Sequence, residues 1–238
     1  MVEWTEHRDG TIVMARVVAG GSRPPTLRVE RRLLREGATV VAAIDEVGRG
    51  ALSGPVTVGV VLVTARTRSA PPGVRDSKLL RAPSREALVP RIQRWAAGYA
   101  VAHASAREVD ERGVVAALRL AGRRALRSVV PRPDVVLLDG DHDYLSVPAA
   151  PGLYESVEDL GDVPAVVTMI RADVSCAAVA AASVLAKTAR DALMTELARQ
   201  YPHYGWHDNK GYATESHRRA LAEFGPTPQH RRTWRLYG

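Results

Sequence analysis

An almost unbroken apolar run, ATVVAAI at residues 38–44, constrains the fold of this 238-residue chain more than any other segment. A run without polar alternation is typical of a strand that is buried on both faces of a sheet. Two carboxylates, Asp45 and Glu46, follow the run directly, and a glycine-rich stretch, GRGALSGP, begins at Gly48. The sequence therefore predicts a covered strand whose end carries two adjacent acidic side chains.

Strand-like and helix-like segments alternate along the rest of the chain. A second strand is expected at residues 56–63, close enough to the first for an antiparallel pair, and further strands near 99–104, 135–138 and 166–170. Helices are expected at residues 27–36, 84–95, 113–130, 175–200 and 214–224. Segments 27–36 and 113–130 have apolar residues at helical spacing, Ser84 is a suitable N-cap, and 175–200 is rich in alanine, which permits close packing. This order predicts an α/β domain with a mixed sheet.

The chain divides into three expected parts. Residues 1–26, with Gly20-Gly21 and Pro24-Pro25 and little periodicity, are interpreted as an N-terminal extension or loosely attached start. Residues 27–200 form the expected α/β core, and residues 201–238 form an expected helical C-terminal region.

Composition narrows the class of protein. A net charge of +7 and a pI near 10.0 favour polyanionic partners, although charge alone does not separate nucleic acid from an anionic membrane. The single cysteine, Cys176, excludes an internal disulfide framework and is expected to be a buried helix residue. No run approaches the ~20 apolar residues of a membrane span, and the polar N-terminus lacks a secretory signal. We therefore expect a cytoplasmic protein without a membrane partner.

Acidic residues stand at the ends of three expected strands. Asp139 ends the strand at 135–138, and Asp173 follows the strand at 166–170. Ligands usually bind at the carboxyl ends of strands in open α/β sheets. With Asp45 and Glu46, these side chains would supply hard oxygen ligands for Mg²⁺ or Mn²⁺. Two such ions about 3.5–4 Å apart can activate a water and neutralise a phosphate, which is sufficient for phosphodiester hydrolysis without a covalent intermediate.

Each acid also has a plainer interpretation. Asp173 can serve as a helix cap, Asp139 as a turn residue before Gly140, and Asp45-Glu46 as a solvated loop start. Neighbouring residues of a regular strand point to opposite faces, so Asp45 and Glu46 cannot both point inward from one. One hypothesis is that Gly48 lets the chain leave the strand early and redirects Glu46.

Other polar residues are assigned no role in catalysis. Asp191, four residues after Lys187 on a helix, is expected to form an ion pair with it. The histidines of the C-terminal part have no regular zinc spacing and are expected to meet solvent or phosphate; they are His203, His207, His217 and His230. Solvated charge is expected for Asp141, Asp143, Glu155, Glu158, Asp159 and Asp162.

Several motifs, in order, resemble the type 2 ribonucleases H, specifically the ribonuclease HII family. They are Ile44-Asp45-Glu46-Val47-Gly48-Arg49-Gly50 with Gly54-Pro55, Asp76-Ser77-Lys78, Leu138-Asp139-Gly140, Arg171-Ala172-Asp173, the segment Ala180–Asp191, Asn209-Lys210-Gly211-Tyr212 and His230-Arg231-Arg232-Thr233-Trp234. The resemblance extends from about Leu27 to Trp234. Ribonuclease HIII is less similar, since it resembles a lysine-containing version of the glycine motif and has a substantial N-terminal domain.

The resemblance implies a ribonuclease H-like mixed β-sheet flanked by helices, with residues 27–200 as the catalytic core and residues 201–238 as a helical substrate-binding region. It also implies a role for each motif. The catalytic, metal-binding residues would be Asp45, Glu46, Asp139 and Asp173, with a two-ion site for Mg²⁺ or Mn²⁺. Substrate-binding residues would be Gly48, Arg49 and Gly50 at the 2′-hydroxyl of an RNA–DNA junction, Tyr212 near the following deoxyribose, and Lys78 and Lys187. Glycines allow close approach of the backbone, and the 2′-hydroxyl distinguishes RNA from DNA.

The implied activity is endonucleolytic cleavage of the RNA strand of RNA–DNA hybrids, 5′ of a ribonucleotide, leaving a 3′-hydroxyl and a 5′-phosphate. DNA that contains single ribonucleotides would also be a substrate, which implies roles in ribonucleotide excision and in DNA replication and repair. The chain departs from the family pattern at Arg171, where lysine is usual, and at Asp141, where an uncharged polar residue is expected. A further carboxylate at Asp141 would alter the metal affinity.

Two other functions stay open on sequence grounds, and a monomer is expected in each case. A non-catalytic nucleic-acid-binding module would use the arginine-rich helices but would leave the acidic residues unexplained, because carboxylates repel phosphates unless metal intervenes. A metal-dependent phosphohydrolase of small phosphate esters would use the acids, but the chain has no P-loop pattern, and its +7 charge favours an extended polyanion.

Overall fold

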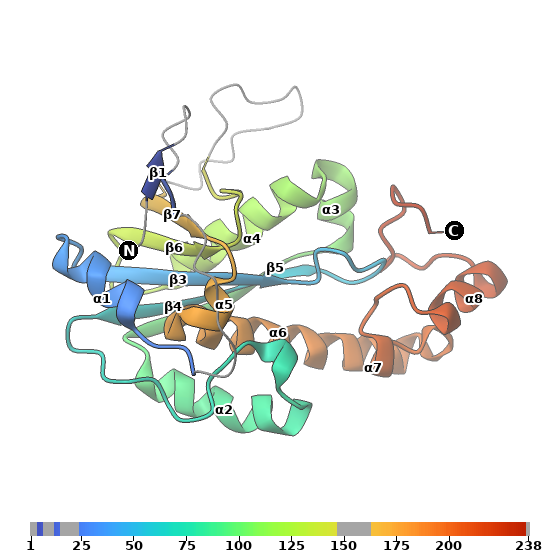
Figure 1. Ribbon diagram of the computed structural model, residues 1–238. Helices are drawn as coiled ribbons and strands as arrows, with labels where there is room; N and C mark the ends of the chain where they lie inside the picture. Colours follow the sequence, from blue (N-terminus) through green and yellow to red (C-terminus); the bar gives the residue numbers. More distant parts are fainter. Residues whose placement is uncertain (1–3, 7–11, 15–23, 147–162, 237–238) are drawn as a thin grey trace.

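The apolar run at residues 38–44 forms most of strand β3 (Val40–Val47), which lies inside a mixed sheet (Figure 1). The computed structural model describes residues 4–6, 12–14, 24–146 and 163–236. β3 pairs in parallel with β6 (Val135–Asp139) and antiparallel with β4 (Val56–Thr64). β7 (Ala165–Met169) pairs in parallel with β6, and β5 (Gly98–Ala104) pairs antiparallel with β4. The prediction of an α/β fold with a mixed sheet is confirmed.

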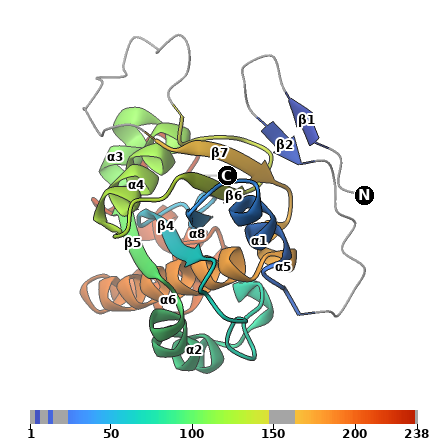
Figure 2. The same cartoon turned by 90° about the vertical axis from the view of Figure 1, so that its left-hand side faces the viewer.

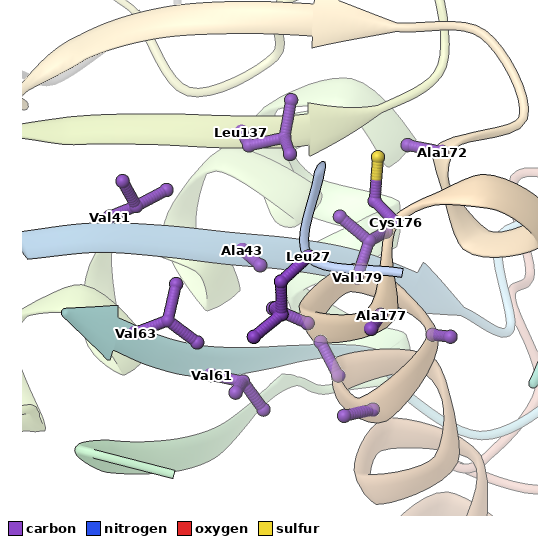
Figure 3. Packing of buried hydrophobic residues seen from close by; sticks show 14 of the residues in the cluster. Leu27, Val41, Ala43, Val61, Val63, Leu137, Ala172, Cys176, Ala177 and Val179 are labelled. Atoms are coloured by element: carbon purple, nitrogen blue, oxygen red, sulfur yellow. The ribbon is translucent and has the colours of Figure 1, made fainter. Parts of the chain in front are cut away.

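Helices cover both faces of the sheet, which accounts for the unbroken apolar run. Figures 1 and 2 show α2 (Ala82–Trp95) and α6 (Ala177–Gln200) on one side and α3 (Ala106–Arg112) and α4 (Val114–Ser128) on the other. Val41 and Ala43 pack on the α6 side, where Figure 3 shows them with Leu27, the residue directly before α1 (Arg28–Arg35). Ala42 and Ile44 pack on the α4 side. Each face of β3 therefore contributes to a separate hydrophobic cluster.

Small residues bring α6 close to the sheet. A Cβ added at Gly59 of β4 would lie 2.4 Å from the carbonyl oxygen of Ala182, so a larger residue would push the helix away. The buried Glu30 accepts a hydrogen bond of 2.8 Å from the backbone N–H of Ala178 and so fixes the start of α6. Cys176 is buried immediately before this helix, as expected for a structural residue. These contacts hold α6 alongside the strand ends that carry the acidic residues.

Some elements were not predicted. No strand is predicted within residues 1–26, yet β1 (Trp4–Glu6) and β2 (Ile12–Met14) extend the sheet, with β2 parallel to β7. Three-residue strands are too short to show a period of two. α3 was also missed, although Ser105 and Glu108 form the capping box that marks its start.

The C-terminal part is helical, as predicted. It contains a 3₁₀ turn (Pro202–Tyr204), α7 (Trp206–Asn209) and α8 (Glu215–Phe224); a second 3₁₀ turn (Ser77–Leu79) lies between β4 and α2. Among the described helices, none has both the length and the apolar character that crossing a membrane requires.

Candidate active site

Three aspartates meet at the carboxyl ends of adjacent strands. Asp45 follows Ile44 on β3 and Asp139 follows Leu138 on β6, and these two preceding residues are partners in the parallel ladder. Asp173 lies in the first turn of α5 (Ala172–Ser175), a short helix directly after β7. One carboxylate oxygen from each aspartate lies within 4.8 Å of the other two. The expected convergence of these three side chains at one edge of the sheet is therefore present.

Hydrogen bonds fix the orientation of Asp139. Its Oδ1 accepts from the backbone N–H groups of Ala172 at 2.6 Å and Asp173 at 3.3 Å, at the N-terminus of α5. Gly140, with φ of 104°, turns the chain and donates its N–H to the carbonyl of Met169. Asp173 does not cap α5, because the backbone N–H groups at the start of this helix bond to Asp139 instead.

The electrostatics of this cluster are unfavourable without a bound cation. Burial, followed by the charges of Asp139 and Glu46, raises the pKa of Asp45 well above its usual value. Burial and the charge of Asp173 raise the pKa of Asp139 to about 6. Lys78 places its Nζ 3.6 Å from Asp173 Oδ2 and offsets part of the negative charge. Three close carboxylate oxygens of this kind fit a hard divalent cation such as Mg²⁺ or Mn²⁺.

Glu46 lies beside this group but not in it. The hypothesis that Gly48 ends the strand early is wrong, because the ladder with β4 continues through Glu46 and Val47. Glu46 therefore has the same facing as Ile44, toward the α4 side, while Asp45 faces α6. Burial, followed by the charge of Asp139, raises the pKa of Glu46 to about 7. Its carboxylate is therefore close enough to Asp139 for the two charges to interact.

The loop after β6 contributes a residue that the sequence analysis did not identify. Tyr144 is 2% exposed, and its buried hydroxyl lies against the carboxylate of Glu46. Burial and the charges of Glu46, Asp45 and Asp139 raise the pKa of this hydroxyl. Gly122 of α4 makes room for the loop, since a Cβ there would lie 2.3 Å from Leu145 Cδ2. No motif of the sequence marks this tyrosine.

The other acids near this loop have varied surroundings. Asp141 is exposed, as expected. Asp143 is not simply solvated, because its carboxylate accepts from the backbone N–H groups of Leu145 and Ser146. Four acids of the expected solvated set lie outside the described residues: Glu155, Glu158, Asp159 and Asp162.

The glycine-rich loop at residues 48–55 lies directly after β3 and beside the acidic cluster. Gly48 has φ of 86°, and a Cβ there would lie 2.2 Å from Arg190 Nε, so only glycine fits. Around Gly50 there is open space. The side chain of Arg49 is 54% exposed, with Nη1 4.0 Å from Glu46 Oε1. The loop thus presents a guanidinium and open backbone next to the carboxylates.

Tyr212 lies next to this loop although it is far away in sequence. The N–H groups of Leu52 and Ser53 both donate to the carbonyl of Gly211, which joins the two segments. The guanidinium carbon of Arg190 lies 5.5 Å from the centre of the Tyr212 ring. The structure therefore brings together the glycine motif and the tyrosine that the sequence analysis assigned to substrate binding.

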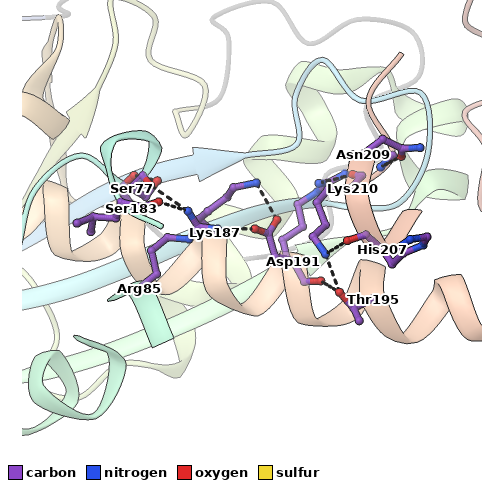
Figure 4. A network of polar contacts seen from close by, with 12 residues as sticks. Ser77, Arg85, Ser183, Lys187, Asp191, Thr195, His207, Asn209 and Lys210 are labelled. Atoms are coloured by element: carbon purple, nitrogen blue, oxygen red, sulfur yellow. Dashed lines mark hydrogen bonds and ion pairs between the residues drawn. The ribbon is translucent and has the colours of Figure 1, made fainter. Parts of the chain in front are cut away.

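The ion pair expected between Lys187 and Asp191 is confirmed. Lys187 Nζ lies 2.7 Å from Asp191 Oδ1, and Arg85 Nη2 lies 3.0 Å from Asp191 Oδ2. Figure 4 shows this network along α6, with Lys210 Nζ donating to Thr195 Oγ1 beside it. Two cations, Lys187 and Arg85, share the one carboxylate of Asp191, and the Nζ atom of Lys187 lies 6.0 Å from the centre of the Tyr212 ring.

The expectation that the histidines meet solvent or phosphate is wrong for His217 and His230. Both are buried, and their Nε2 atoms are 3.1 Å apart. The Nε1–H of Trp206 donates to Nε2 of His217, and Nδ1 of His217 is 2.9 Å from the carbonyl oxygen of Tyr212. They form an internal network because the C-terminal segment folds back onto α8. His203 and His207 are exposed, as expected.

Known proteins match the chain in both sequence and structure. A family model described as Ribonuclease HII matches residues 42–237. The ribonuclease HII of Streptomyces avermitilis is 47% identical over 212 residues, an alignment that covers 89% of this chain and 84% of that protein. The match includes the strand ends and loops that carry the acidic cluster.

Two solved structures show a similar fold. Ribonuclease H2 from Pyrococcus horikoshii OT3 superposes with a TM-score of 0.65 and 25% identity, covering 83% of this chain and 95% of that one. The ribonuclease HII of Archaeoglobus fulgidus, solved in a complex with PCNA, gives a TM-score of 0.64 and 27% identity, with coverages of 84% and 96%.

Proposed function

Since the chain belongs to the ribonuclease HII family and is a ribonuclease H hydrolase, we propose that it cuts RNA–DNA hybrids 5′ of a ribonucleotide at an RNA–DNA junction. Single ribonucleotides embedded in duplex DNA belong to the same substrate class. The observation that carries the proposal is the convergence of Asp45, Asp139 and Asp173 beside the glycine-rich loop and Tyr212.

The acidic residues supply the site for the cations on which this family depends. Asp45, Glu46, Asp139 and Asp173 would hold two ions, Mg²⁺ or Mn²⁺, with Asp139 kept in place by its bonds to the start of α5. Ions bound there would supply activation of a water and stabilisation of negative charge on the phosphate, and hydrolysis by this route would leave a 3′-hydroxyl and a 5′-phosphate. Lys78, in the 3₁₀ turn that precedes α2, offsets part of the negative charge of Asp173.

The neighbouring loops supply recognition of the ribonucleotide. Within the Gly48-Arg49-Gly50 motif, Arg49 is exposed and Gly50 has open space around it, which supports close approach of this backbone to a 2′-hydroxyl. Tyr212 is half-buried and presents its ring near the same edge, in position to stack on the deoxyribose that follows the junction. Lys187 is proposed to contact the phosphate backbone of the substrate. Its partner Asp191 also pairs with Arg85, so Asp191 keeps a cationic partner when Lys187 turns toward the substrate.

The proposed cellular role follows from the same substrate class. We place the protein in the cytoplasm as a monomer that removes ribonucleotides and RNA primers from DNA. The net charge of +7 supports a long polyanionic partner rather than a small phosphate ester.

Cleavage of a duplex that carries one ribonucleotide tests the proposed function. In the presence of Mg²⁺ or Mn²⁺ we expect one cut on the 5′ side of that ribonucleotide and no cut in the all-DNA duplex. Retained binding without cleavage would contradict the proposal in favour of a binding module. Turnover of small phosphate esters alone would favour a phosphohydrolase.

Arg49→Ala is expected to weaken the preference for RNA–DNA junctions more than it weakens general binding. Loss of one charged hydrogen-bonding group from the loop should lower the junction preference roughly tenfold, with less change in affinity for an all-DNA duplex. Competition between the two duplexes measures the ratio. Arg132→Ala, at an exposed arginine before the opposite end of β6, is the matched control. A junction preference equal to that of the wild type would argue against the role of the glycine loop.

A further inference from the structure

Two guanidinium groups are completely buried behind the glycine-rich loop. Arg190 on α6 and Arg231 in the C-terminal segment are both 0% exposed. Among the described residues, neither forms an ion pair with a carboxylate; instead, their N–H groups donate to backbone carbonyls. A buried charge is costly unless it is well hydrogen-bonded, so an arrangement of this kind indicates a specific task.

The carbonyls that these arginines bind are those of the loop itself. Arg231 donates to Gly48 at 2.6 Å, to Arg49 at 2.8 Å and to Gly54 at 3.2 Å. Arg190 donates to Ser53 at 3.1 Å and to Pro55 at 2.9 Å. The carbonyl groups on both arms of the loop therefore point inward, toward positive charge.

The loop N–H groups divide into two sets. Those of Ala51, Leu52, Ser53 and Gly54 donate to other backbone carbonyls of the protein. Those of Gly48, Arg49 and Gly50 have no hydrogen-bond partner within the described part of the chain, and of these three residues Gly48 is buried whereas Arg49 and Gly50 are exposed. Because the carbonyls are turned inward, the N–H groups of the two exposed residues are the backbone donors that remain for a substrate oxygen.

Several contacts fix the segment that carries Arg231 to the glycine-rich loop and to α8. The Arg231 N–H donates to the carbonyl of Leu52 at 2.9 Å, and His230 pairs with Ser53 in an isolated bridge. The ring of Trp234 lies 4.8 Å from the Arg231 guanidinium, and His230 bonds to the buried His217. The closing His-Arg-Arg-Thr-Trp motif, which had no assigned role, thus holds the guanidinium under the loop.

We propose that Arg231, with Arg190, is a positioning residue that sets the preference for a ribonucleotide by holding the glycine-rich loop with the Arg49 and Gly50 N–H groups outward. The inference rests on the proposed function, in which this loop contacts the 2′-hydroxyl. A lysine at this position would keep the charge but lose the planar fork that reaches three carbonyls at once.

Arg231→Lys tests the proposal through binding. Affinities are measured for a duplex with one ribonucleotide and for the same duplex made only of DNA, with Ca²⁺ in place of Mg²⁺ and with recovery of the intact strands as a check. The ratio of the two affinities is expected to fall about tenfold, because badly placed donors lose a hydrogen bond to the 2′-hydroxyl. The affinity for the all-DNA duplex should change little. Arg232→Lys, at the exposed neighbouring arginine, should keep the wild-type ratio.

The outcomes separate this inference from the proposed function. A wild-type protein without any preference for the ribonucleotide contradicts both. A wild-type preference that Arg231→Lys keeps unchanged, with unaltered Mn²⁺ affinity and thermal unfolding, overturns only the role of Arg231. If Arg231→Lys does not fold, Trp234→Leu removes the ring beside the guanidinium and leaves the loop sequence intact. That variant should lower the same ratio by a smaller factor, and an unchanged ratio overturns the proposal.

Discussion

Asp45→Asn is expected to abolish cleavage and to leave the protein folded. Asp45 belongs to the acidic group, and one of its carboxylate oxygens lies within 4.8 Å of oxygens from both Asp139 and Asp173. Loss of one charged ligand from a site that stabilises a phosphate should lower kcat/KM at least about a thousandfold, which corresponds to roughly 4 kcal/mol. Initial rates on the single-ribonucleotide duplex measure this change.

The same variant should lose activity without losing stability in its metal-free form. In the absence of metal, burial and the charges of Asp139 and Glu46 destabilise the ionised form of Asp45 and therefore raise its pKa. Asparagine removes this charge, so the metal-free variant should unfold at the same temperature as the wild type or a higher one at about pH 8. Glu111→Gln, at an exposed carboxylate of α3 on the other side of the sheet from the α6 face, is the control that should keep near-normal activity. Full activity of Asp45→Asn would refute the metal-site assignment.

Divalent metal should stabilise the protein strongly at about pH 8 and only weakly at about pH 5.5. The pKa values of Asp139 and Glu46 are raised from 3.8 to about 6 and from 4.5 to about 7 in the metal-free protein. With raised pKa values, the folded state binds more protons than the unfolded state, so these carboxyls destabilise the metal-free fold at high pH and this cost disappears as the pH falls. Cations and protons compete for the same oxygens, so metal binding weakens in acid.

Thermal unfolding with and without Mn²⁺ measures this difference. At a concentration one hundred times the dissociation constant, stabilisation should be about 2.7 kcal/mol. His217 and His230 act with the opposite sign, because burial lowers their pKa values, in the case of His230 to about 4, and their protonation destabilises the fold in acid. The shift caused by metal at each pH is therefore compared, rather than the absolute stability. Equal shifts at both pH values, or an undiminished shift in Asp45→Asn, would count against the site.

Elements with a simple physical pattern could be predicted from the sequence. The run before Asp45 is apolar because both faces of β3 are covered, and strands that end at one edge bring Asp45 and Asp139 together. The ion pair of Lys187 with Asp191 follows from helical spacing alone. These features depend on local periodicity or on sheet geometry.

Features that depend on long-range packing could not be predicted. Glu46 stays in β3 because it pairs with β4. The nearby Gly48 and Gly50 give no sign of this pairing in the sequence. Tyr144 is directed at the acidic group by a loop that packs against Gly122, and Arg231 reaches the glycine-rich loop only because the C-terminus folds back onto it. His217 and His230 are buried for the same reason. In each case the partner is distant in sequence, so no local pattern marks the contact.

The central claim is that the acidic group at the ends of β3 and β6 binds divalent cations. A crystal structure of the protein soaked in Mn²⁺, with anomalous diffraction to locate the ions, tests it most directly. We predict Mn²⁺ bound by Asp45 and Asp139, with oxygen distances of about 2.2 Å, and with Glu46 or Asp173 completing the site. Manganese bound elsewhere, or no manganese between these two aspartates, would contradict the account.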